Sequence, residues 1–315
     1  MIHEPRILFA TDRNYIQHTM VTLTSILVHL DPKAKLYVYV LSEDLTEDDQ
    51  TSFSSLQNLH PFELNFIHVD LRIFKHLTSM RNSWMTYARL LSPYLFPNLE
   101  KILYLDSDLI FETDLSELWN VDLKDKMFAA VPDNPYRMKS RKKQLKIPKE
   151  KMYVNGGVLI LDLNKMRSRN AWKRIQTFID KWNVRVLKYH DQDLLNALFH
   201  DDILLLEYKW NFIAMYASSQ KYCSFFPILP PAVIHFAGAS APWSGFSRLR
   251  YRDRYFHYRK IAGLPEIKRK RTLRDFILYT LPTSFIQPMF FLVKYTGIRF
   301  LYYRLTGRQY HSLDK

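Results

Sequence analysis

The chain has 315 residues, 47% of them hydrophobic and 24% charged, and this composition is that of a globular protein with one large domain and an appendage. Its single cysteine, Cys223, excludes an intramolecular disulfide and a zinc site built from cysteines. The formal net charge is +14, yet residues 246–315 hold 16 Lys/Arg against 4 Asp/Glu, so the positive charge belongs mainly to the C-terminal segment.

Short apolar runs alternate with amphipathic segments over the first 70 residues. We predict strands at 6–10, 35–42 and 63–70, which are rich in β-branched and aromatic residues. The intervening segments 15–30 and 42–59 have the residue spacing of helices. This order of strands and helices is typical of a parallel sheet with helices on its faces.

The same alternation continues in the middle of the chain. We expect a helix at 84–96, which Pro93 interrupts, and then a buried strand at 102–105. Further strand candidates are 128–131 and 158–161. Ligands of open α/β sheets collect beyond the carboxyl ends of the strands, so the residues that follow these strands are the first candidates for a site.

Two carboxylates follow the buried strand at positions i and i+2, in the triplet Asp106-Ser107-Asp108. Where the chain turns, such a pair can converge on one divalent cation. Mg²⁺ and Mn²⁺ prefer oxygen ligands and keep part of their coordination shell for phosphate oxygens. Alternatively, Asp106 only caps a turn at a solvated strand end, and the triplet alone leaves both interpretations open.

Several motifs accompany this triplet in a fixed order: ILFATDRNYIQHTMVTLTSIL near the N-terminus, YLDSDLIF, VNGGVLILDL, HDQDLLNALF, WN and IHFAGASAPWS. Together they span residues 6–244 and resemble glycosyltransferase family 8, whose retaining enzymes include bacterial lipopolysaccharide and lipooligosaccharide galactosyl- and glucosyltransferases. The resemblance implies an α/β fold of the GT-A type, with a Rossmann-like mixed sheet flanked by helices. It also implies a divalent metal, Mn²⁺ or Mg²⁺, that bridges the protein and the diphosphate of a UDP-hexose donor.

The motif positions imply three metal ligands, which are Asp106, Asp108 and His235. His235 follows the apolar run Ala232–Ile234 and can offer a neutral imidazole to Mn²⁺. Outside this motif, the same residue would be interpreted as a histidine of the core with satisfied hydrogen bonds.

The resemblance also implies contacts with the donor. Asp12 and Asn14 match contacts to uracil and ribose, although these residue types also form Asx turns. Arg89 matches an arginine near the donor sugar or diphosphate, and otherwise would be an exposed helix residue in an ion pair. The predicted substrate-binding residues are Asp12, Asn14, Arg89, Asp106, Ser107, Asn155, Gly156, Gly157 and Gly238.

Asn155-Gly156-Gly157 contains two of only seven glycines in the chain, which indicates a geometric demand at this place. Glycine permits the close approach of a ligand, and the resemblance places this segment beside the donor hexose. A tight hairpin or a β-bulge would make the same demand.

Three residues are predicted to be catalytic, and they are Asp133, Asp191 and Gln192. By motif position, Asp191 and Gln192 flank the anomeric carbon of the donor, and Asp133 lies near hydroxyls of acceptor and donor. Because an amide is a poorer nucleophile than a carboxylate, we favour front-face attack with Gln192 stabilising an oxocarbenium-like centre. Asp191 could also bind free N–H groups at a helix N-terminus, and both roles are compatible.

One departure from the family pattern concerns the leaving UDP. The family commonly has a lysine just before Pro-Trp in the last motif, whereas this chain has Ala239-Ser240-Ala241-Pro242-Trp243. Charge on the leaving group needs neutralisation. The metal alone could supply it, or Arg248 or Lys139 could replace the missing lysine.

Two segments are strongly basic. Residues 134–151 contain two prolines and no strong periodicity, and we predict a mobile surface segment close to the site. Residues 246–315 interleave Arg/Lys with aromatic residues, as interfacial segments on anionic membranes do. There are two alternatives: the segment binds single-stranded nucleic acid, or it is a helical subdomain whose basic face is merely solvated. We favour the membrane over nucleic acid because nothing upstream resembles a nucleic-acid module.

The expected organisation is a catalytic domain at 1–245 and a basic aromatic, membrane-associating segment at 246–315. Residues 1–15 lack the features of a secretory signal, and no apolar stretch approaches the roughly 18 residues of a transmembrane helix. We therefore expect a cytoplasmic protein on the inner face of the cell membrane.

The expected function is transfer of galactose or glucose to a glycan or glycolipid acceptor, with no nucleic-acid partner. A non-catalytic protein that binds nucleotide-sugars or glycans is an alternative because the lysine is missing. A phosphohydrolase of the Asp-x-Asp type fits less well, because Leu109-Ile110-Phe111 follows the aspartates where such enzymes usually have small residues and Thr or Val.

Overall fold

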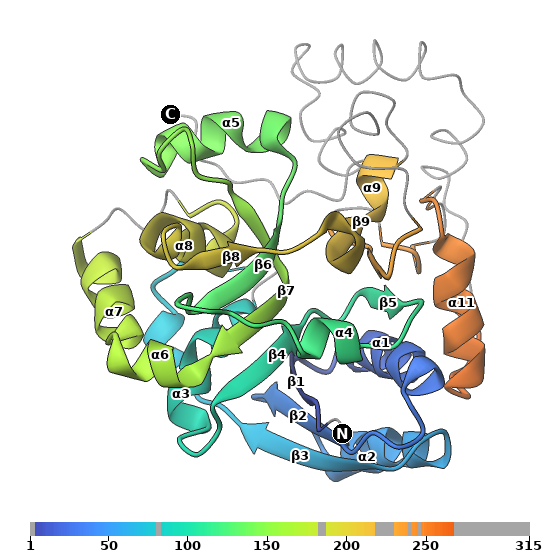
Figure 1. The fold of residues 1–315 in the computed structure, drawn as a ribbon. Coiled ribbons are helices and arrows are strands. Elements are labelled where there is room, and N and C mark those ends of the chain that lie inside the picture. The colour runs from blue at the N-terminus through green and yellow to red at the C-terminus, as the bar shows by residue number, and fades with distance from the viewer. Residues whose placement is uncertain are drawn as a thin grey trace, which may run out of the picture. The chain divides into compact units, whose positions relative to one another are not determined.

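The structure is a computed structural model, and the part of the chain that it describes is 4–79, 83–181, 187–217, 230–238, 241–244, 247 and 249–267. Residues up to Ala241, together with Leu249–Pro265, form one compact unit (Figure 1). Most of the predicted membrane-associating segment and Arg248 lie outside the described residues, so their predicted roles stay predictions.

A seven-stranded mixed sheet forms the centre of this unit, with the strand order β3-β2-β1-β4-β7-β6-β8. The first four strands along the chain are parallel, β7 is antiparallel to both β4 and β6, and β8 is parallel to β6. This sheet confirms the predicted fold class and every predicted strand. Its strands are β1 (Arg6–Ala10), β2 (Leu36–Ser42), β3 (Phe62–His68), β4 (Lys101–Leu105), β6 (Phe128–Pro132), β7 (Val154–Asp162) and β8 (Ile203–Leu205).

Helices cover both faces of the sheet. Successive side chains of each strand point to opposite sides, and since both sets are apolar, both faces must be shielded from water. Ile7 and Phe9 of β1 enter a core that α1, α2 and α4 close, whereas Leu8 enters a core closed by α6, α7 and α8. The helices are α1 (Ile16–His29), α2 (Glu47–Ser54), α3 (Ser92–Leu95), α4 (Ser116–Trp119), α5 (Pro135–Gln144), α6 (Leu163–Ser168), α7 (Ala171–Lys181), α8 (His190–Phe199), α9 (Ala214–Ala217) and α11 (Arg252–Ile261).

Two predicted helices differ from those observed. The helix predicted at 42–59 begins at Glu47, because Thr46 and Asp49 form a capping box, and it ends in a 3₁₀ turn. The helix predicted at 84–96 is a 3₁₀ helix at Met85–Leu91 followed by α3. The change from 3₁₀ helix to α-helix falls between Leu91 and Ser92, close to Pro93 as predicted. Pro93 itself lies in the first turn of α3, where no N–H donor is needed.

The prediction that 134–151 is a mobile segment is wrong, because this segment contains α5. Asn134 caps the helix, and its Oδ1 accepts hydrogen bonds from the backbone N–H groups of Tyr136 and Arg137 at 3.1 and 3.2 Å. Periodicity was weak because α5 presents mostly cations and buries only Met138 and Arg141. A capping asparagine before Pro135 was the available signal for a helix start.

A buried ion pair fastens α5 to α8. The guanidinium of Arg141 binds Asp193 of α8 through two nitrogens, and Nε lies 2.7 Å from Oδ1. Asp193 also accepts hydrogen bonds from the Tyr153 hydroxyl and the Tyr189 N–H, both at 2.6 Å. Because all its partners are present, this buried carboxylate is well compensated and holds α5 in one place.

A small second sheet lies beside the end of β4. It consists of β5 (Leu109–Phe111), β10 (Val233–His235) and β9 (Phe212–Ile213), in that order. The β5 and β10 strands are antiparallel, and His235 is paired with Leu109. This pairing brings two segments that are distant in sequence to the end of the central sheet.

Helix α11 packs against α1 within the same unit. The Tyr255 hydroxyl lies 2.6 Å from His18 Nδ1, and the Tyr258 hydroxyl lies 2.8 Å from His29 Nε2. Burial lowers the pKa of His18 to about 4, so its imidazole is neutral near pH 7. The predicted division of the chain after residue 245 stays a prediction.

No helix within the described residues has both the length and the hydropathy that crossing a membrane requires.

Replacement of Arg141 by methionine tests the buried ion pair. We expect Arg141→Met to lower the free energy of unfolding by about 3 kcal/mol, because it leaves the Asp193 carboxylate buried without its cation. Urea denaturation followed by circular dichroism measures this loss.

The matched control is Lys139→Met on the exposed face of the same helix, which should change stability by less than about 0.5 kcal/mol. Equal stabilities of the two variants would show that the ion pair does not hold α5 in place.

Candidate active site

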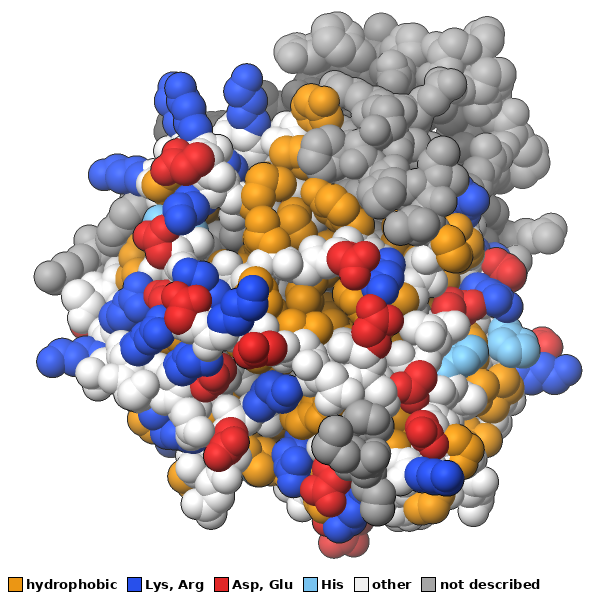
Figure 2. Space-filling model, in the orientation of Figure 1, with side chains coloured by type: hydrophobic (Ala, Val, Ile, Leu, Met, Phe, Trp, Pro, Cys, Tyr) orange, Lys and Arg blue, Asp and Glu red, His pale blue; other side chains and the backbone are white. Residues whose placement is uncertain are grey.

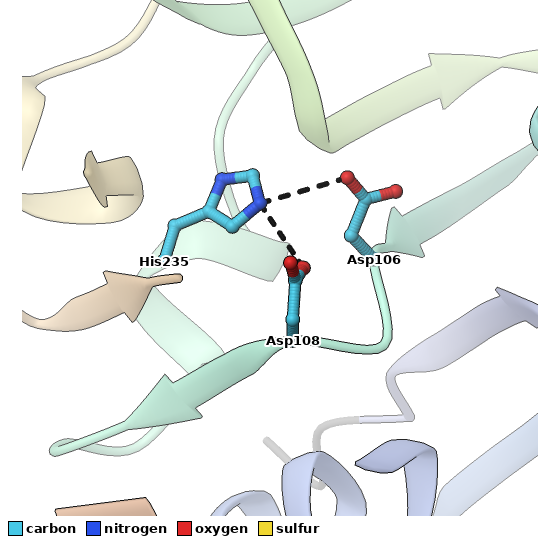
Figure 3. Close-up of side chains that lie close together, drawn as sticks. All are labelled: Asp106, Asp108 and His235. Carbon is cyan, nitrogen blue, oxygen red and sulfur yellow. Dashed lines mark ion pairs between the residues drawn. The ribbon is translucent and has the colours of Figure 1, made fainter. Parts of the chain in front are cut away.

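Asp106, Asp108 and His235 converge at the junction of the two sheets (Figure 3). Asp106 follows β4, Asp108 precedes β5, and His235 ends β10. The His235 Nε2 atom lies 3.1 Å from Asp108 Oδ1 and 3.7 Å from Asp106 Oδ2, and one ligand atom of each residue lies within 4.8 Å of the others. Two carboxylates and an imidazole that converge in this way form a donor set that fits Mn²⁺ or Mg²⁺.

The orientation of His235 is held by an amide behind it. Its Nδ1 lies 2.7 Å from Asn211 Oδ1, an acceptor, so Nδ1 donates and Nε2 faces the two aspartates. Burial alone would lower the pKa of His235, but the carboxylates of Asp108 and Asp106 outweigh it and raise this pKa. A metal at Nε2 must therefore displace a proton that the carboxylates favour.

Gly157 lies against this group because β4 and β7 are antiparallel. The Asp106 N–H donates to the Gly157 carbonyl at 2.8 Å. A Cβ atom at position 157 would lie 2.3 Å from His235 Cε1 and 3.0 Å from Asp106 Oδ2. The packing of the metal-ligand candidates therefore requires a glycine at this position. The register of β7 with β6 also shifts across residues 155–158, so of the two alternative interpretations the β-bulge agrees with the structure and the hairpin does not.

Arg89 is buried between the metal-ligand candidates and α8, with 4% of its surface exposed. Its NH2 group lies 3.1 Å from Asp106 Oδ1, its Nε lies 3.0 Å from Asp191 Oδ2, and its NH1 donates to the Gly156 carbonyl. Burial alone would lower the pKa of the guanidinium. The carboxylates of Asp191 and Asp106, together with Tyr104, outweigh this effect, so the pKa is raised above its usual value. The alternative of an exposed helix residue is wrong.

Asp191 is buried at the N-terminal turn of α8 and faces Arg89. Burial raises the pKa of its carboxyl to about 6, and the attraction of Arg89 only partly offsets this rise. Its Oδ2 atom is shielded from solvent and forms an ion pair with Arg89 at 3.0 Å. Because the Nε proton of Arg89 is donated to the Thr86 carbonyl, Oδ2 accepts no hydrogen bond among the described residues. A buried acceptor of this kind is a place where a ligand hydroxyl can donate a hydrogen bond.

Gln192 is held by a network of amides. Its Oε1 accepts from the Gly156 N–H at 3.0 Å and from Asn155 Nδ2 at 3.2 Å, and its Nε2 donates to the Tyr153 hydroxyl at 3.2 Å. The Oδ1 atom of Asn155 accepts in turn from Asn211, the residue behind His235. The amide at position 192 and the imidazole at position 235 thus belong to one hydrogen-bonded chain.

Asp133 lies at the other end of this network, directly after Pro132, which pairs with Val154 of β7 beyond a register shift. Its Oδ1 accepts from the Tyr216 hydroxyl at 2.7 Å and from the Asn134 N–H at 2.6 Å. Its Oδ2 is 3.4 Å from Gln192 Nε2. The structure therefore brings all three predicted catalytic residues to one place.

The other predicted binding residues surround this centre less closely. Asp12 and Asn14 follow β1 and form an Asx turn, in which the Asn14 N–H donates to Asp12 Oδ1 at 3.0 Å. The Ser107 hydroxyl accepts a hydrogen bond from Thr19 of α1. Gly238 follows β10 with a φ of +107°, which only glycine adopts without strain. The predicted contacts of these four residues with a substrate stay predictions.

Four residues of the site were not predicted. Asn211 orients His235, and Tyr216 donates to Asp133. Tyr153 accepts a hydrogen bond from the Gln192 amide and donates one to Asp193. Asn211 stood within the recognised WN motif, and Asp193 within HDQDLL, so their motifs pointed to them. Nothing in the sequence pairs Tyr153 or Tyr216 with a partner, because those contacts arise from the fold.

Neither predicted replacement for the missing lysine is seen among these contacts. Lys139 lies on the exposed face of α5, and Arg248 lies outside the described residues.

Comparisons with known proteins give a consistent picture. A family model described as glycosyl transferase family 8 matches residues 6–246. General stress protein A of Bacillus subtilis is 27% identical over 271 residues, covering 80% of this chain and 92% of that protein. A lipopolysaccharide 1,2-glucosyltransferase of Escherichia coli is 26% identical over 273 residues, covering 84% and 80%.

A solved structure of the galactosyltransferase LgtC, in complex with donor and acceptor sugar analogues, is similar in fold. The TM-score is 0.73 with 25% sequence identity, and the match covers 84% of this chain and 97% of LgtC.

Replacement of Gly157 by alanine tests the packing of the metal-ligand candidates. We expect Gly157→Ala to weaken Mn²⁺ binding by at least about 10-fold, because the new methyl group displaces His235 from the aspartates. Isothermal titration calorimetry measures the affinity.

Gly263→Ala is the control, since its added methyl group meets no atom within 4 Å and the strain from its φ of +67° concerns only the turn after α11. An unchanged Mn²⁺ affinity of Gly157→Ala would contradict a metal site at these three residues.

Proposed function

The chain belongs to glycosyltransferase family 8 and is a glycosyltransferase, and we propose that it is a metal-dependent, retaining hexosyltransferase. In this proposal it transfers galactose or glucose from a UDP-sugar to a glycan or glycolipid acceptor of the lipopolysaccharide type. The observation that carries the proposal is the convergence of Asp106, Asp108 and His235 on one point, with Asp191 and Gln192 across Arg89 and Gly156. The glucosyltransferase and galactosyltransferase relatives support the choice of sugars.

Asp106, Asp108 and His235 would hold Mn²⁺ or Mg²⁺, which supplies charge neutralisation to the diphosphate of the donor. Arg89 keeps Asp106 in position through its ion pair and so preserves the ligand set. Asp12 and Asn14, at the end of β1, are proposed to bind uracil and ribose. In this proposal the nucleotide lies at the carboxyl ends of the parallel strands, where ligands of such sheets collect.

Asp191 is proposed to bind hydroxyls of the donor hexose, through the buried Oδ2 atom that lacks a hydrogen bond among the described residues. Gln192 is proposed to face the anomeric carbon and to stabilise positive charge there through the dipole of its side-chain amide. Its Oε1 is held by the Gly156 N–H and Asn155, which fixes the amide before a substrate arrives.

The acceptor is proposed to approach from the side of Asp133. The Tyr216 and Asn134 hydrogen bonds hold Oδ1 of this carboxylate and leave Oδ2 directed toward Gln192. Attack on the same face from which UDP departs would retain the anomeric configuration without a covalent intermediate. Gln192 supports this route, because its amide is a poorer nucleophile than a carboxylate would be at the same position.

We also propose that residues 246–315 attach the protein to an anionic membrane surface on the cytoplasmic side, without a role for nucleic acid. The basis is the excess of Lys/Arg over Asp/Glu together with the interleaved aromatic residues.

A binding protein without turnover remains the second candidate, and the absence of a lysine from residues 236–244 favours it. Tight UDP binding with no hydrolysis or transfer across UDP-sugars would support this candidate over the enzyme.

Substitution of the aspartates tests metal dependence. We expect Asp106→Asn and Asp108→Asn each to reduce Mn²⁺-dependent hydrolysis of UDP-galactose or UDP-glucose by at least about 100-fold, since a neutral amide is a weak ligand for a hard cation. Release of UDP in the absence of any acceptor is the measurement, and EDTA should abolish it in the unchanged protein.

Circular dichroism should show that both variants stay folded. Full activity of both variants, or full activity in EDTA, would exclude the proposed metal-dependent mechanism.

The pH dependence tests the role of Asp191. Because burial raises the pKa of its carboxyl to about 6, we expect kcat/KM for the donor to fall as the pH drops through about 6. Below that pH the carboxyl is protonated, which weakens its ion pair with Arg89 and its ability to accept from sugar hydroxyls.

The Asp191→Asn variant has no titrating carboxyl at this position. We expect its kcat/KM to be much lower at all pH values and to show no decrease near pH 6. A decrease at an unchanged pH in that variant would assign it to another group.

A further inference from the structure

Helix α5 begins at the proposed acceptor side of the site and carries a dense set of cations. Asp133 is followed directly by the cap Asn134, and α5 runs from Pro135 to Gln144. Between positions 134 and 149 the sequence contains seven Lys/Arg and no Asp/Glu. Figure 2 shows Lys and Arg side chains projecting from the surface at α5, at the upper left of the view.

The ordinary structural needs of α5 explain only part of this charge. Arg141 is buried against Asp193 and so is neutralised within the fold. Lys142 lies in the last helical turn, where a cation stabilises the helix dipole, and its Nζ donates to the Lys149 carbonyl at 2.8 Å. Lys143 lies in the same turn but is exposed. Arg137 and Lys139 lie in the first half of the helix, where a cation is unfavourable for the dipole, and Lys149 lies beyond the helix. These positions suggest a ligand.

Two arginines of α5 connect the helix to the site. Arg137 NH1 lies 3.2 Å from the Tyr216 hydroxyl, which donates to Asp133 at 2.7 Å. The ion pair between Arg141 and Asp193 fastens the helix to α8, which carries Gln192. The helix that carries the lysines is therefore fixed beside the reacting groups before a ligand binds.

We propose that α5 and the following turn to Lys149 form a subsite for phosphate groups on the acceptor glycan. We call it the α5 subsite, and it deepens the proposed function, on which it rests. A ten-residue helix is about 15 Å long, so the phosphates recognised lie on sugar units beyond the one that receives the hexose. Several separate lysines, each a point charge, suit groups that carry nearly two negative charges each.

Chemical protection of lysines tests the subsite without requiring turnover. The protein is acetylated in the presence of lipid-free oligosaccharides released from bacterial lipopolysaccharide by mild acid, either phosphorylated or treated with phosphatase. We expect mass spectrometry to show that the phosphorylated oligosaccharides alone protect Lys143 and Lys149. Lys173, exposed on α7, is the internal control and should react equally in all samples. Equal protection by both oligosaccharides, or none by either, would overturn the proposal.

Kinetics provide a second test. In Lys143→Glu/Lys149→Glu, we expect the KM for the phosphorylated oligosaccharide to rise by about 10-fold, as two lost attractions would produce. The control Lys173→Glu should leave this KM unchanged. Hydrolysis of the UDP-sugar without acceptor separates the two proposals. Its absence from the unchanged protein would reject the proposed function, whereas hydrolysis without any preference for phosphorylated acceptors would reject the subsite alone.

An anionic membrane is the competing occupant of the same surface. Co-sedimentation with phosphatidylglycerol vesicles measures that interaction. If the double variant loses vesicle binding but keeps its KM for the lipid-free phosphorylated acceptor, the surface belongs to the membrane and the subsite proposal is wrong.

Discussion

A buried guanidinium holds the candidate site together. Arg89 lies between Asp106 and Asp191, and its NH1 group also binds the carbonyl of Gly156. Without this cation, two carboxylates would face each other in a protein interior, where unpaired charge is costly. One residue thus permits the metal-ligand candidates and the α8 carboxylate to share a small space, and the rest of the site is arranged around it.

The order of the strands explains why so few residues suffice. The parallel strands end on one side, β7 returns antiparallel beside β4, and β10 pairs with β5. This arrangement places an aspartate pair, a glycine pair and a histidine at one junction. The hydrogen-bonded amides of Asn211, Asn155 and Gln192 then connect the metal side to the sugar side, and each amide is oriented by both neighbours.

Much of this arrangement could be predicted from the sequence, because the periodicity of apolar residues predicts the strands and the order of the motifs predicts the site. The strands and the convergence of Asp106, Asp108 and His235 followed from local patterns and from the family resemblance. The helix at α5 did not, since a helix covered with cations has little apolar periodicity and its anchor, Arg141, pairs with a distant Asp193. Contacts such as Tyr216 with Asp133 depend on tertiary structure and leave no mark in a single sequence.

The distance in sequence between the metal-ligand candidates has a thermodynamic consequence. Asp106 and Asp108 flank the turn between β4 and β5, whereas His235 ends β10, about 130 residues further along the chain. A cation bound by all three would cross-link these segments in a chain with one cysteine, and the unfolded chain could not bind it comparably. Its binding free energy would then add to the stability of the fold, so that the thermal midpoint would rise with the concentration of the free ion.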